Sequence, residues 1–492
     1  MNGKMHSETG AFSSDGMRAE ILNPFVHKLE LDNTYDKIKT AIFTVILLPF
    51  RVIVICYLIV TAWFLACIGL YGLSEEDLRR KPMTGWRRAL KPLICFIGKL
   101  SYLAGGMAIS VRGRQASRKE APILVVAPHS SFLDSCIVYA TRMSSVIVRK
   151  ESMDNYVGKL INYTQPVYVW RDDPNSRANT IKEIIQRATS KEDWPQILIF
   201  PEGTCTNRSC LITFKSGGFY PGVPVQPVTI RYPNARDTVT WTWEGPGALK
   251  LLWLTLTQVH SSCEIEFLPV YYPSEEERRD PKLYARNVRD VMAKALGVPV
   301  LDYTYDDCRL IAKAKQLGIP SAPSVREVAE LRAQLGLERS QIELHLISQG
   351  AARRARWLGA EEFARRLGLQ PGDAQRLAQL FIQPSSGLIY FPDYLLCAAF
   401  LMTQHAPLTQ LLSYAFKLYD STGTGRVNAA TFEEIAGRCL GLCQEDAHNT
   451  FGQADLDEKG WLTYDEFIAF AQKKSFFSFL FTCESAPKPK SQ

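Results

Sequence analysis

The chain has 492 residues, which exceeds one ordinary domain and predicts two or three folded units. Its net charge of +7 suits an anionic membrane surface or an anionic thioester carrier, although a solvated surface with a slight basic excess explains it equally well. No interleaving of basic and aromatic residues indicates a nucleic-acid partner, so that class of function is excluded.

A polar tail over residues 1–36 precedes an apolar segment over 37–75. Residues 40–73 contain one charge, Arg51, close to Pro49. The part after Pro49 is long enough to cross a bilayer as a helix. We therefore expect either one spanning helix or a hairpin that dips into one leaflet and turns near Pro49, with a buried core helix as the alternative. The segment begins too late and is too long for a cleavable signal peptide.

A basic and interfacial linker over 76–118 follows the apolar segment. Its six lysines and arginines between 79 and 91 outnumber the two lysines just before the segment, which favours a cytosolic location for the domain that follows. A second apolar stretch, 92–109, has Lys99 in its middle and indicates an amphipathic interfacial element rather than a span. The 12 cysteines lack the spacing of a zinc site. Buried, reduced thiols agree with a cytosolic domain.

Short apolar runs alternate with helical runs through residues 119–310, the predicted catalytic domain. The predicted strands are 123–127, 145–149, 166–170, 196–200, 225–231 and 264–270, and the predicted helices include 132–142 and 177–190. This alternation predicts an α/β fold with a mainly parallel sheet and helices on its faces.

His129 follows the first of these strands, and Asp134 comes five residues later. Ligands of open α/β sheets bind where strands end, so this turn is a candidate site. The carboxylate can return to hydrogen-bond one ring nitrogen of His129, which leaves the other nitrogen as a base near neutral pH. A histidine and an aspartate at this spacing also arise by chance, so the pair alone does not specify a function.

A second polar turn, residues 202–205, follows the strand at 196–200. Glu202 supplies a charge, Gly203 allows close backbone approach, and Thr204 adds a hydroxyl beside Cys205. The same loop could hold an anionic group, because polar and basic residues follow it. These residues are Asn207, Arg208 and Lys215.

In these turns the sequence resembles the glycerolipid acyltransferase superfamily. His129 and Asp134 match its HxxxxD motif, and residues 202–205 match its EGTC motif. Two further blocks lie in the expected order. Residues 165–171 keep the arginine of one block, Arg171, although Gln165 and Tyr168 replace its glycine and phenylalanine, and residues 223–228 match the fourth, apolar block.

The resemblance extends from about residue 23 to about residue 471. It is to lysophosphatidylcholine acyltransferases with C-terminal EF-hands, nearest to the type 2 form that also acetylates lyso-platelet-activating factor. It implies a mixed sheet flanked by helices and a membrane-bound enzyme of phospholipid remodelling. That enzyme would move an acyl or acetyl group from acyl-CoA or acetyl-CoA to the free hydroxyl of a lysophospholipid. It also implies the endoplasmic reticulum, with the Golgi or lipid droplets as alternatives.

The resemblance also implies roles for the motif residues. His129 would take the proton of the attacking hydroxyl and Asp134 would stabilise the imidazolium, with no cofactor required for the chemistry. A second group of residues would form the substrate site. Four of them would position the phosphate of the acyl acceptor: Arg171, Glu202, Gly203 and Thr204. Cys205 would have a packing role in the same site.

Two other functions are open alternatives. The chain could be a catalytically inactive, calcium-responsive membrane scaffold, although intact His129, Asp134 and Glu202 argue against it. It could also hydrolyse acyl-CoA or phospholipid, although the Gly-x-Ser-x-Gly elbow of serine hydrolases is absent from the turn at His129.

Residues 325–475 are predicted to form an all-α domain of degenerate EF-hands. Loop 455–466 has carboxylates at its first, third and last positions, but Lys459 takes the fifth. Loop 420–431 ends in Thr431, without the usual bidentate carboxylate, and loop 382–393 lacks its acidic first residue. The candidate Ca²⁺ ligands are Asp455, Asp457, Trp461 and Glu466 in the first loop, and Asp420, Thr422 and Thr424 in the second.

We expect Ca²⁺ to bind weakly at best and the helix pairs to be structural. Activity should then be nearly insensitive to micromolar Ca²⁺. Residues 476–492 are predicted to be a flexible tail.

Overall fold

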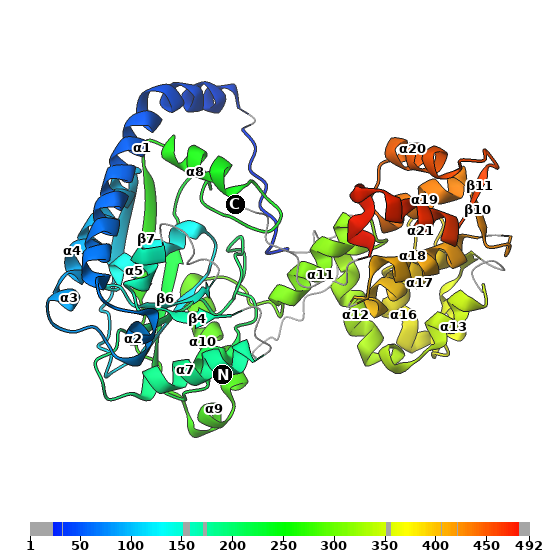
Figure 1. The fold of residues 1–492 in the computed structure, drawn as a ribbon. Helices are drawn as coiled ribbons and strands as arrows, with labels where there is room; N and C mark the ends of the chain where they lie inside the picture. Colours follow the sequence, from blue (N-terminus) through cyan, green and yellow to red (C-terminus); the bar gives the residue numbers. More distant parts are fainter. Residues whose placement is uncertain are drawn as a thin grey trace, which may run out of the picture. The chain divides into compact units, whose positions relative to one another are not determined.

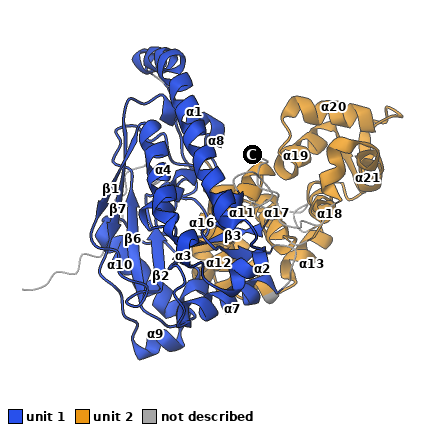
Figure 2. Ribbon diagram, turned by 60° about the vertical axis from the view of Figure 1, so that its left-hand side comes forward, with its two compact units in different colours: residues 1–302 blue, residues 303–492 orange. Residues whose placement is uncertain are grey.

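The computed structural model describes residues 23–31, 33–150, 158–170, 175–350, 356–404, 406–420 and 422–481. It divides into two compact units, residues 1–302 and 303–492 (Figure 2). Most of the predicted N-terminal tail and of the predicted C-terminal tail lies outside the described residues. In the described part of the chain every cysteine is free and most are buried.

A seven-stranded sheet with the order β1-β7-β6-β2-β5-β3-β4 is the centre of the first unit (Figure 1). Its neighbouring strands are parallel except β6 and β7, which confirms the predicted mainly parallel sheet. The strands are β1 (Met107–Arg112), β2 (Ile123–Ala127), β3 (Ser145–Arg149), β4 (Val167–Val169), β5 (Ile197–Ile199), β6 (Val225–Arg231) and β7 (Ser261–Phe267).

The central strand β2 is completely buried because it has a neighbour on each edge and helices over both faces. Its side chains alternate between two hydrophobic clusters, as the two-residue period of a strand requires. Ile123 and Val125 belong to the cluster under α7 (Ser176–Thr189) and α10 (Pro281–Leu296). Leu124 and Val126 belong to the cluster under α5 (Cys136–Ala140).

The stretch 92–109 differs from its prediction as one interfacial element. It contains the helix α4 (Lys91–Ala104) and then enters β1, which pairs with β7. The predicted helix at 132–142 is a 3-10 turn, η1 (Phe132–Ser135), followed by the short α5. The other helices of this unit are α2 (Glu75–Arg80), α3 (Gly85–Ala89), α6 (Gly158–Asn162), α8 (Ala248–Leu256) and α9 (Glu275–Arg279), with a 3-10 turn, η3 (Ser216–Phe219).

The apolar segment forms one long helix, α1 (Thr34–Leu70), which continues through Pro49. The hairpin turn that we considered near Pro49 is therefore replaced by a continuous helix, which Figure 1 shows bent between its first part and the part beside α4. Proline removes one helical hydrogen bond and commonly bends a helix. Leu58, Ala62 and Ala66, one helical turn apart, pack into a cluster with α4.

The second unit is helical apart from short strands, which confirms a helical C-terminal region. Its helices are α11 (Tyr305–Gln316), α12 (Val325–Gln334), α13 (Ile342–Ser348), α15 (Ala360–Arg366), α16 (Pro371–Gln379), α17 (Phe391–Met402), α18 (Leu408–Tyr419), α19 (Ala429–Cys439), α20 (Gln444–Ala454) and α21 (Tyr464–Lys473). Strand β8 (Trp357–Leu358) pairs with β9 (Ile389–Tyr390), and β10 (Arg426–Asn428) pairs with β11 (Trp461–Thr463).

The end of this unit differs from the flexible tail predicted from residue 476. A 3-10 helix, η6 (Ser475–Leu480), follows α21. Phe477 and Leu480 are buried in the core of the unit, which explains why this segment is ordered.

Candidate active site

His129 lies in the turn between β2 and η1, and the predicted hydrogen bond to Asp134 is present. His129 Nδ1 lies 2.8 Å from Asp134 Oδ2. The same carboxylate oxygen accepts the backbone N–H groups of Ser130 at 2.7 Å and Ser131 at 2.9 Å. An ionised carboxylate only accepts, so in the neutral ring Nδ1 carries the proton and Nε2 carries the lone pair. The five-residue spacing works because η1 folds Asp134 back onto the turn.

The surroundings of His129 stabilise its charged form. The ring stacks on Phe200 at 4.4 Å and its side chain is 25% exposed. Burial by itself lowers the pKa of His129, but interactions with Cys205 and Asp134 outweigh burial and raise the pKa well above 6.5. The imidazole therefore holds a proton strongly, and the neutral base becomes available only as pH rises.

Glu202 holds the His129 turn from the opposite side. Its carboxylate is buried and accepts the backbone N–H of His129 at 2.6 Å and that of Ile212 at 3.4 Å. Burial is the largest cause that raises its pKa, to about 7. These two contacts hold the backbone of the His129 turn in place. The expected contact of Glu202 with the phosphate of the acyl acceptor stays a prediction.

The remaining residues of the EGTC turn surround the same histidine. Gly203 has a φ of +68°, a conformation that favours glycine, and a Cβ there would lie 2.7 Å from Lys215 Nζ, so a larger residue would also have to displace the lysine side chain. Thr204 and Cys205 are half-buried. The backbone N–H of Thr206 donates to the carbonyl of His129 at 2.8 Å. The two motif turns, far apart in the sequence, thus lie against each other at the candidate site.

Arg208 lies closer to the catalytic turn than its place in the sequence suggested. Its guanidinium donates to Ser130 Oγ at 3.2 Å and to Asp237 Oδ2 at 2.6 Å. It also lies over the ring of Tyr232, 5.3 Å from the ring centroid. Its φ of +66° is rare for a residue with a side chain, and such conformations gather at functional sites.

Two contacts at this site were missed by sequence reasoning. Tyr232 donates its phenolic O–H to Asp134 Oδ1 at 2.6 Å, and Asp237 pairs with Arg208. Tyr232 and Asp237 both follow the predicted strand 225–231, which is the parallel neighbour of β2. Parallel strands end at the same edge of a sheet, and that rule could have placed Tyr232 beside His129.

The predicted phosphate contact Arg171 lies outside the described residues. The strand that precedes it, β4, is the third strand from β2 on that side of the sheet.

The two loops that contain the candidate Ca²⁺ ligands have their carboxylates engaged within the protein. Lys459 Nζ lies 2.5 Å from Glu466 Oε1 and 3.7 Å from Asp457. Asp455 accepts the backbone N–H groups of Lys459 at 3.0 Å and Gly460 at 2.7 Å. The ammonium group thus lies among the predicted ligands, where a calcium ion would carry the positive charge.

The second loop is engaged in the same way. Asp420 accepts backbone N–H groups from Thr422, Gly423 and Gly425. The hydroxyls of Thr422 and Thr424 lie 2.7 Å apart, and the indole of Trp461 in the first loop lies under Arg426. Among the described residues, no three acidic, histidine or cysteine side chains converge on a possible metal position. The residues present therefore fit a calcium ion poorly.

Comparisons with known proteins agree with the class that the site indicates. The acyltransferase family model matches residues 108–231, a range that runs from β1 to β6 and contains both motif turns. The match places residues 108–231 in the class of acyltransferase domains.

The relatives identify the family within that class. A lysophosphatidylcholine acyltransferase of Drosophila melanogaster is 42% identical, over 99% of this chain and 92% of its own length. Lysophosphatidylcholine acyltransferase 1 of Homo sapiens is 44% identical, over 93% of this chain and 86% of its own. Lysophosphatidylcholine acyltransferase 2 of Homo sapiens is 40% identical, over 94% and 85%. The chain belongs to the lysophosphatidylcholine acyltransferase family.

Proposed function

We propose that this acyltransferase moves the acyl group of acyl-CoA to the free hydroxyl of lysophosphatidylcholine, in phospholipid remodelling. The observation that carries the proposal is the His129–Asp134 pair, in which Nε2 is left as the free base, within a chain of this family. Lyso-platelet-activating factor and acetyl-CoA are included as a second acceptor and donor, because the motifs of the sequence resemble those of the type 2 form.

The reaction needs one general base. Neutral His129 takes the proton of the lysolipid hydroxyl while the hydroxyl oxygen attacks the thioester carbonyl. The new C–O ester bond forms, the C–S bond breaks, and the imidazolium returns the proton to the CoA thiolate. Asp134 stabilises the imidazolium between these steps. No covalent acyl-enzyme is formed, so Cys205 has a packing and electrostatic role beside the base.

An acyl-transfer panel tests this proposal. Acetyl- and long-chain acyl-CoA are each combined with lysophosphatidylcholine, lyso-platelet-activating factor and a lysolipid with a different headgroup. Transfer to the choline lysolipids supports the proposal. Release of free fatty acid at the same rate without any acceptor would instead favour a hydrolase.

We call the part of the first unit that holds the seven-stranded sheet and the helices around it, other than α1, the catalytic unit. The helix α1 is proposed to lie along this catalytic unit at the membrane surface and not to span the bilayer. Three contacts attach its first half to that unit. Asp36 pairs with Arg236, and Thr44 Oγ1 accepts from Trp253 Nε1 at 2.9 Å. Arg51 is buried and donates to the carbonyls at the end of α8 and just after it: Leu256 at 2.8 Å, Gln258 at 2.6 Å and Val259 at 2.9 Å.

Both ends of α1 return to the same unit. Before it, Asn207 binds the carbonyls of Asn23, Pro24 and Val26, and His27 N donates to Glu244 O at 2.8 Å. After it, Arg87 donates to the carbonyls of Gly69 and Tyr71. The segment from His27, which is bonded to the catalytic unit, to Thr34, where α1 begins, reaches about 25 Å when fully extended. This is less than the roughly 30 Å of a bilayer core, so the segment is too short to cross the membrane. Both ends therefore lie on one side of the membrane.

An apolar surface faces away from the catalytic unit and is suited to insertion into one leaflet. We call it the membrane face. It consists of exposed residues of α1, α4 and α8: Ile46, Phe50, Ile53, Tyr57, Val60, Phe64, Phe96, Leu103 and Leu249. Figure 1 shows α1 and α4 running side by side, and the two helices pack on each other. This arrangement supports a membrane-bound enzyme. The endoplasmic reticulum as its membrane is proposed from the family resemblance, and the cytosolic side from the basic residues that follow α1.

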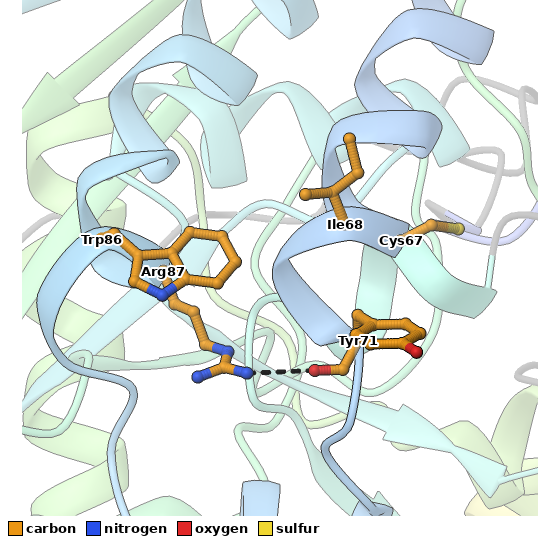
Figure 3. Close-up of a pocket in the computed structure, with 5 residues that line it drawn as sticks. All are labelled: Cys67, Ile68, Tyr71, Trp86 and Arg87. Carbon is orange, nitrogen blue, oxygen red and sulfur yellow. Dashed lines mark hydrogen bonds between the residues drawn. The ribbon is translucent and has the colours of Figure 1, made fainter.

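The end of α1 has the composition of a membrane–water boundary. A hollow of about 390 Å³ lies there, lined by Cys67, Ile68, Tyr71, Trp86 and Arg87 (Figure 3). Trp86 and Tyr71 are exposed, and the guanidinium of Arg87 lies over the indole of Trp86. Tryptophan, tyrosine and arginine are typical of the headgroup level, so this end is proposed to mark the boundary.

The helix pairs α18–α19 and α20–α21 are proposed to be an EF-hand-like module that holds its shape without calcium. Their loops are joined by the antiparallel pair β10–β11. Lys459 supplies the positive charge within loop 455–466, so the module is expected to bind Ca²⁺ weakly or not at all.

A further inference from the structure

The buried carboxylate of Asp134 has a hydrogen-bond partner that belongs to neither motif. Its Oδ2 accepts His129 Nδ1 and two backbone N–H groups, while its Oδ1 accepts the hydroxyl of Tyr232 at 2.6 Å. The phenol is buried, and Asp134 is completely buried. A hydrogen bond to a buried charge is among the stronger kinds in proteins.

The position of Tyr232 suits a role at the base. It directly follows β6, the parallel neighbour of β2, so its side chain reaches the edge where His129 lies. Arg208 lies over its ring at 5.3 Å. A cation over the ring withdraws electron density and strengthens the phenol as a donor. Arg208, Tyr232, Asp134 and His129 therefore form one continuous chain of contacts.

We propose that Tyr232 is a positioning residue that acts on His129 through Asp134. By donating to Oδ1, the hydroxyl fixes the orientation of the carboxylate and draws negative charge away from Oδ2, the oxygen that faces the imidazole. This moderates the proton affinity of His129, so that a larger fraction of the enzyme carries the neutral base. The inference rests on the proposed general-base role of His129.

Other titratable and charged groups face this chain of contacts, and they remain in place when the phenolic hydroxyl is removed. They are Glu202 and Cys205 from the turn after β5, Arg208 from the same loop, Cys136 from α5 and Cys263 from β7. A change in the pH profile on removal of that hydroxyl therefore reports its bond to Asp134.

The test is Tyr232→Phe in the full-length enzyme, with Tyr284→Phe as the matched control. Tyr284 is also buried and donates to a backbone carbonyl, that of Val223, at 2.9 Å, but it contacts none of the four residues of the chain. We expect Tyr232→Phe to lower kcat roughly 10-fold, since a bond to a charged group is lost, with little change in either KM. The acidic limb of its kcat profile should move to higher pH. Tyr284→Phe should change thermal stability alone.

A double-mutant cycle separates action through Asp134 from a general packing effect. With Asp134→Asn already present, Tyr232→Phe should cause little further loss of kcat. Losses that multiply, or a Tyr232→Phe enzyme with normal kcat and pH profile, would overturn the inference.

Two controls distinguish a failure of the Tyr232 role from a folding defect and from a failure of the proposed function. If Tyr232→Phe does not fold, 3-fluorotyrosine incorporated at position 232 strengthens the donor, and the acidic limb should move to lower pH; an unmoved limb would overturn the inference. His129→Ala tests the proposed base by itself. If His129→Ala is active, the proposed function fails, whereas a silent Tyr232→Phe with an inactive His129→Ala overturns only the role of Tyr232.

Discussion

Asp134 and Glu202 hold His129 from two sides but in opposite electrostatic situations. Asp134 accepts four hydrogen bonds, from the His129 ring, two backbone N–H groups and the Tyr232 hydroxyl. Glu202 accepts two backbone N–H groups in a buried position, where desolvation raises its pKa to about 7. The Asp134 carboxylate interacts with the His129 ring, and the Glu202 carboxylate holds the backbone of the His129 turn.

Glu202→Gln should change how stability depends on pH. The folded protein holds the Glu202 proton more tightly than the unfolded chain, whose pKa is 4.5. The bound proton therefore stabilises the folded protein. This stabilisation is fully present below about pH 4.5 and is lost as pH rises to about 7, a loss of roughly 3 kcal/mol at about 1.4 kcal/mol per pH unit. We expect the stability of the wild-type protein relative to the glutamine variant to fall across this window.

Thermal unfolding of the two full-length proteins in detergent, from pH 4.5 to 8, measures this difference. A constant difference across the window would show that Glu202 is ionised throughout.

At the scale of elements, α1 is held by the one charge in its apolar stretch. Arg51→Leu makes α1 more hydrophobic but removes the donors to three backbone carbonyls. We expect this variant to lose at least about 2 kcal/mol of stability, because these bonds involve a buried charge. Ile53→Leu, on the exposed membrane face, is the matched control and should be neutral.

Melting temperature and activity of the two variants in micelles give the comparison. A helix that simply spanned the bilayer would tolerate Arg51→Leu at least as well as Ile53→Leu, and that result would contradict the proposed placement of α1.

Loop 455–466 should gain calcium binding when its internal cation is removed. Lys459→Asn replaces an ammonium group near Glu466 with an oxygen ligand at the fifth loop position. Calorimetry on the full-length protein should show Ca²⁺ binding in the variant and loss of that binding when Glu466→Gln is added. Low-micromolar Ca²⁺ binding by the unaltered protein, or no Ca²⁺ binding by the variant, would show that Lys459 does not determine whether this loop binds Ca²⁺.

The elements around His129 were predictable because the patterns that define them are local. Apolar runs predicted β2, β3 and β6 with their observed bounds, and the spacing of His129 and Asp134 predicted their contact. The strand β1 was missed, because a continuous apolar stretch does not distinguish the end of a helix from a strand. The partners of Arg51 and Tyr232 lie 205 and 98 positions away, and tertiary folding alone brings them together.

At the scale of the whole molecule, both ends of α1 return to the catalytic unit, which supports the proposal that this unit lies on one side of the membrane. We expect residues 120–310 to be digested by protease added to sealed microsomes. Asn162 and Asn207 each begin a glycosylation sequon, Asn-x-Ser/Thr, and we expect both to stay unglycosylated. Asn162 is buried and the amide of Asn207 donates two hydrogen bonds, so glycosylation alone is a weak reporter of orientation. Protection of the catalytic unit from protease would contradict the cytosolic placement.

The most direct measurement compares the purified full-length enzyme with His129→Ala, using labelled acyl-CoA and lysophosphatidylcholine in mixed micelles. The unaltered enzyme should form phosphatidylcholine and free CoA in equal amounts. His129→Ala should lower turnover by roughly 10²–10⁴-fold, the usual contribution of a general base, while expression and membrane association stay the same. Near-normal turnover by His129→Ala would contradict the account.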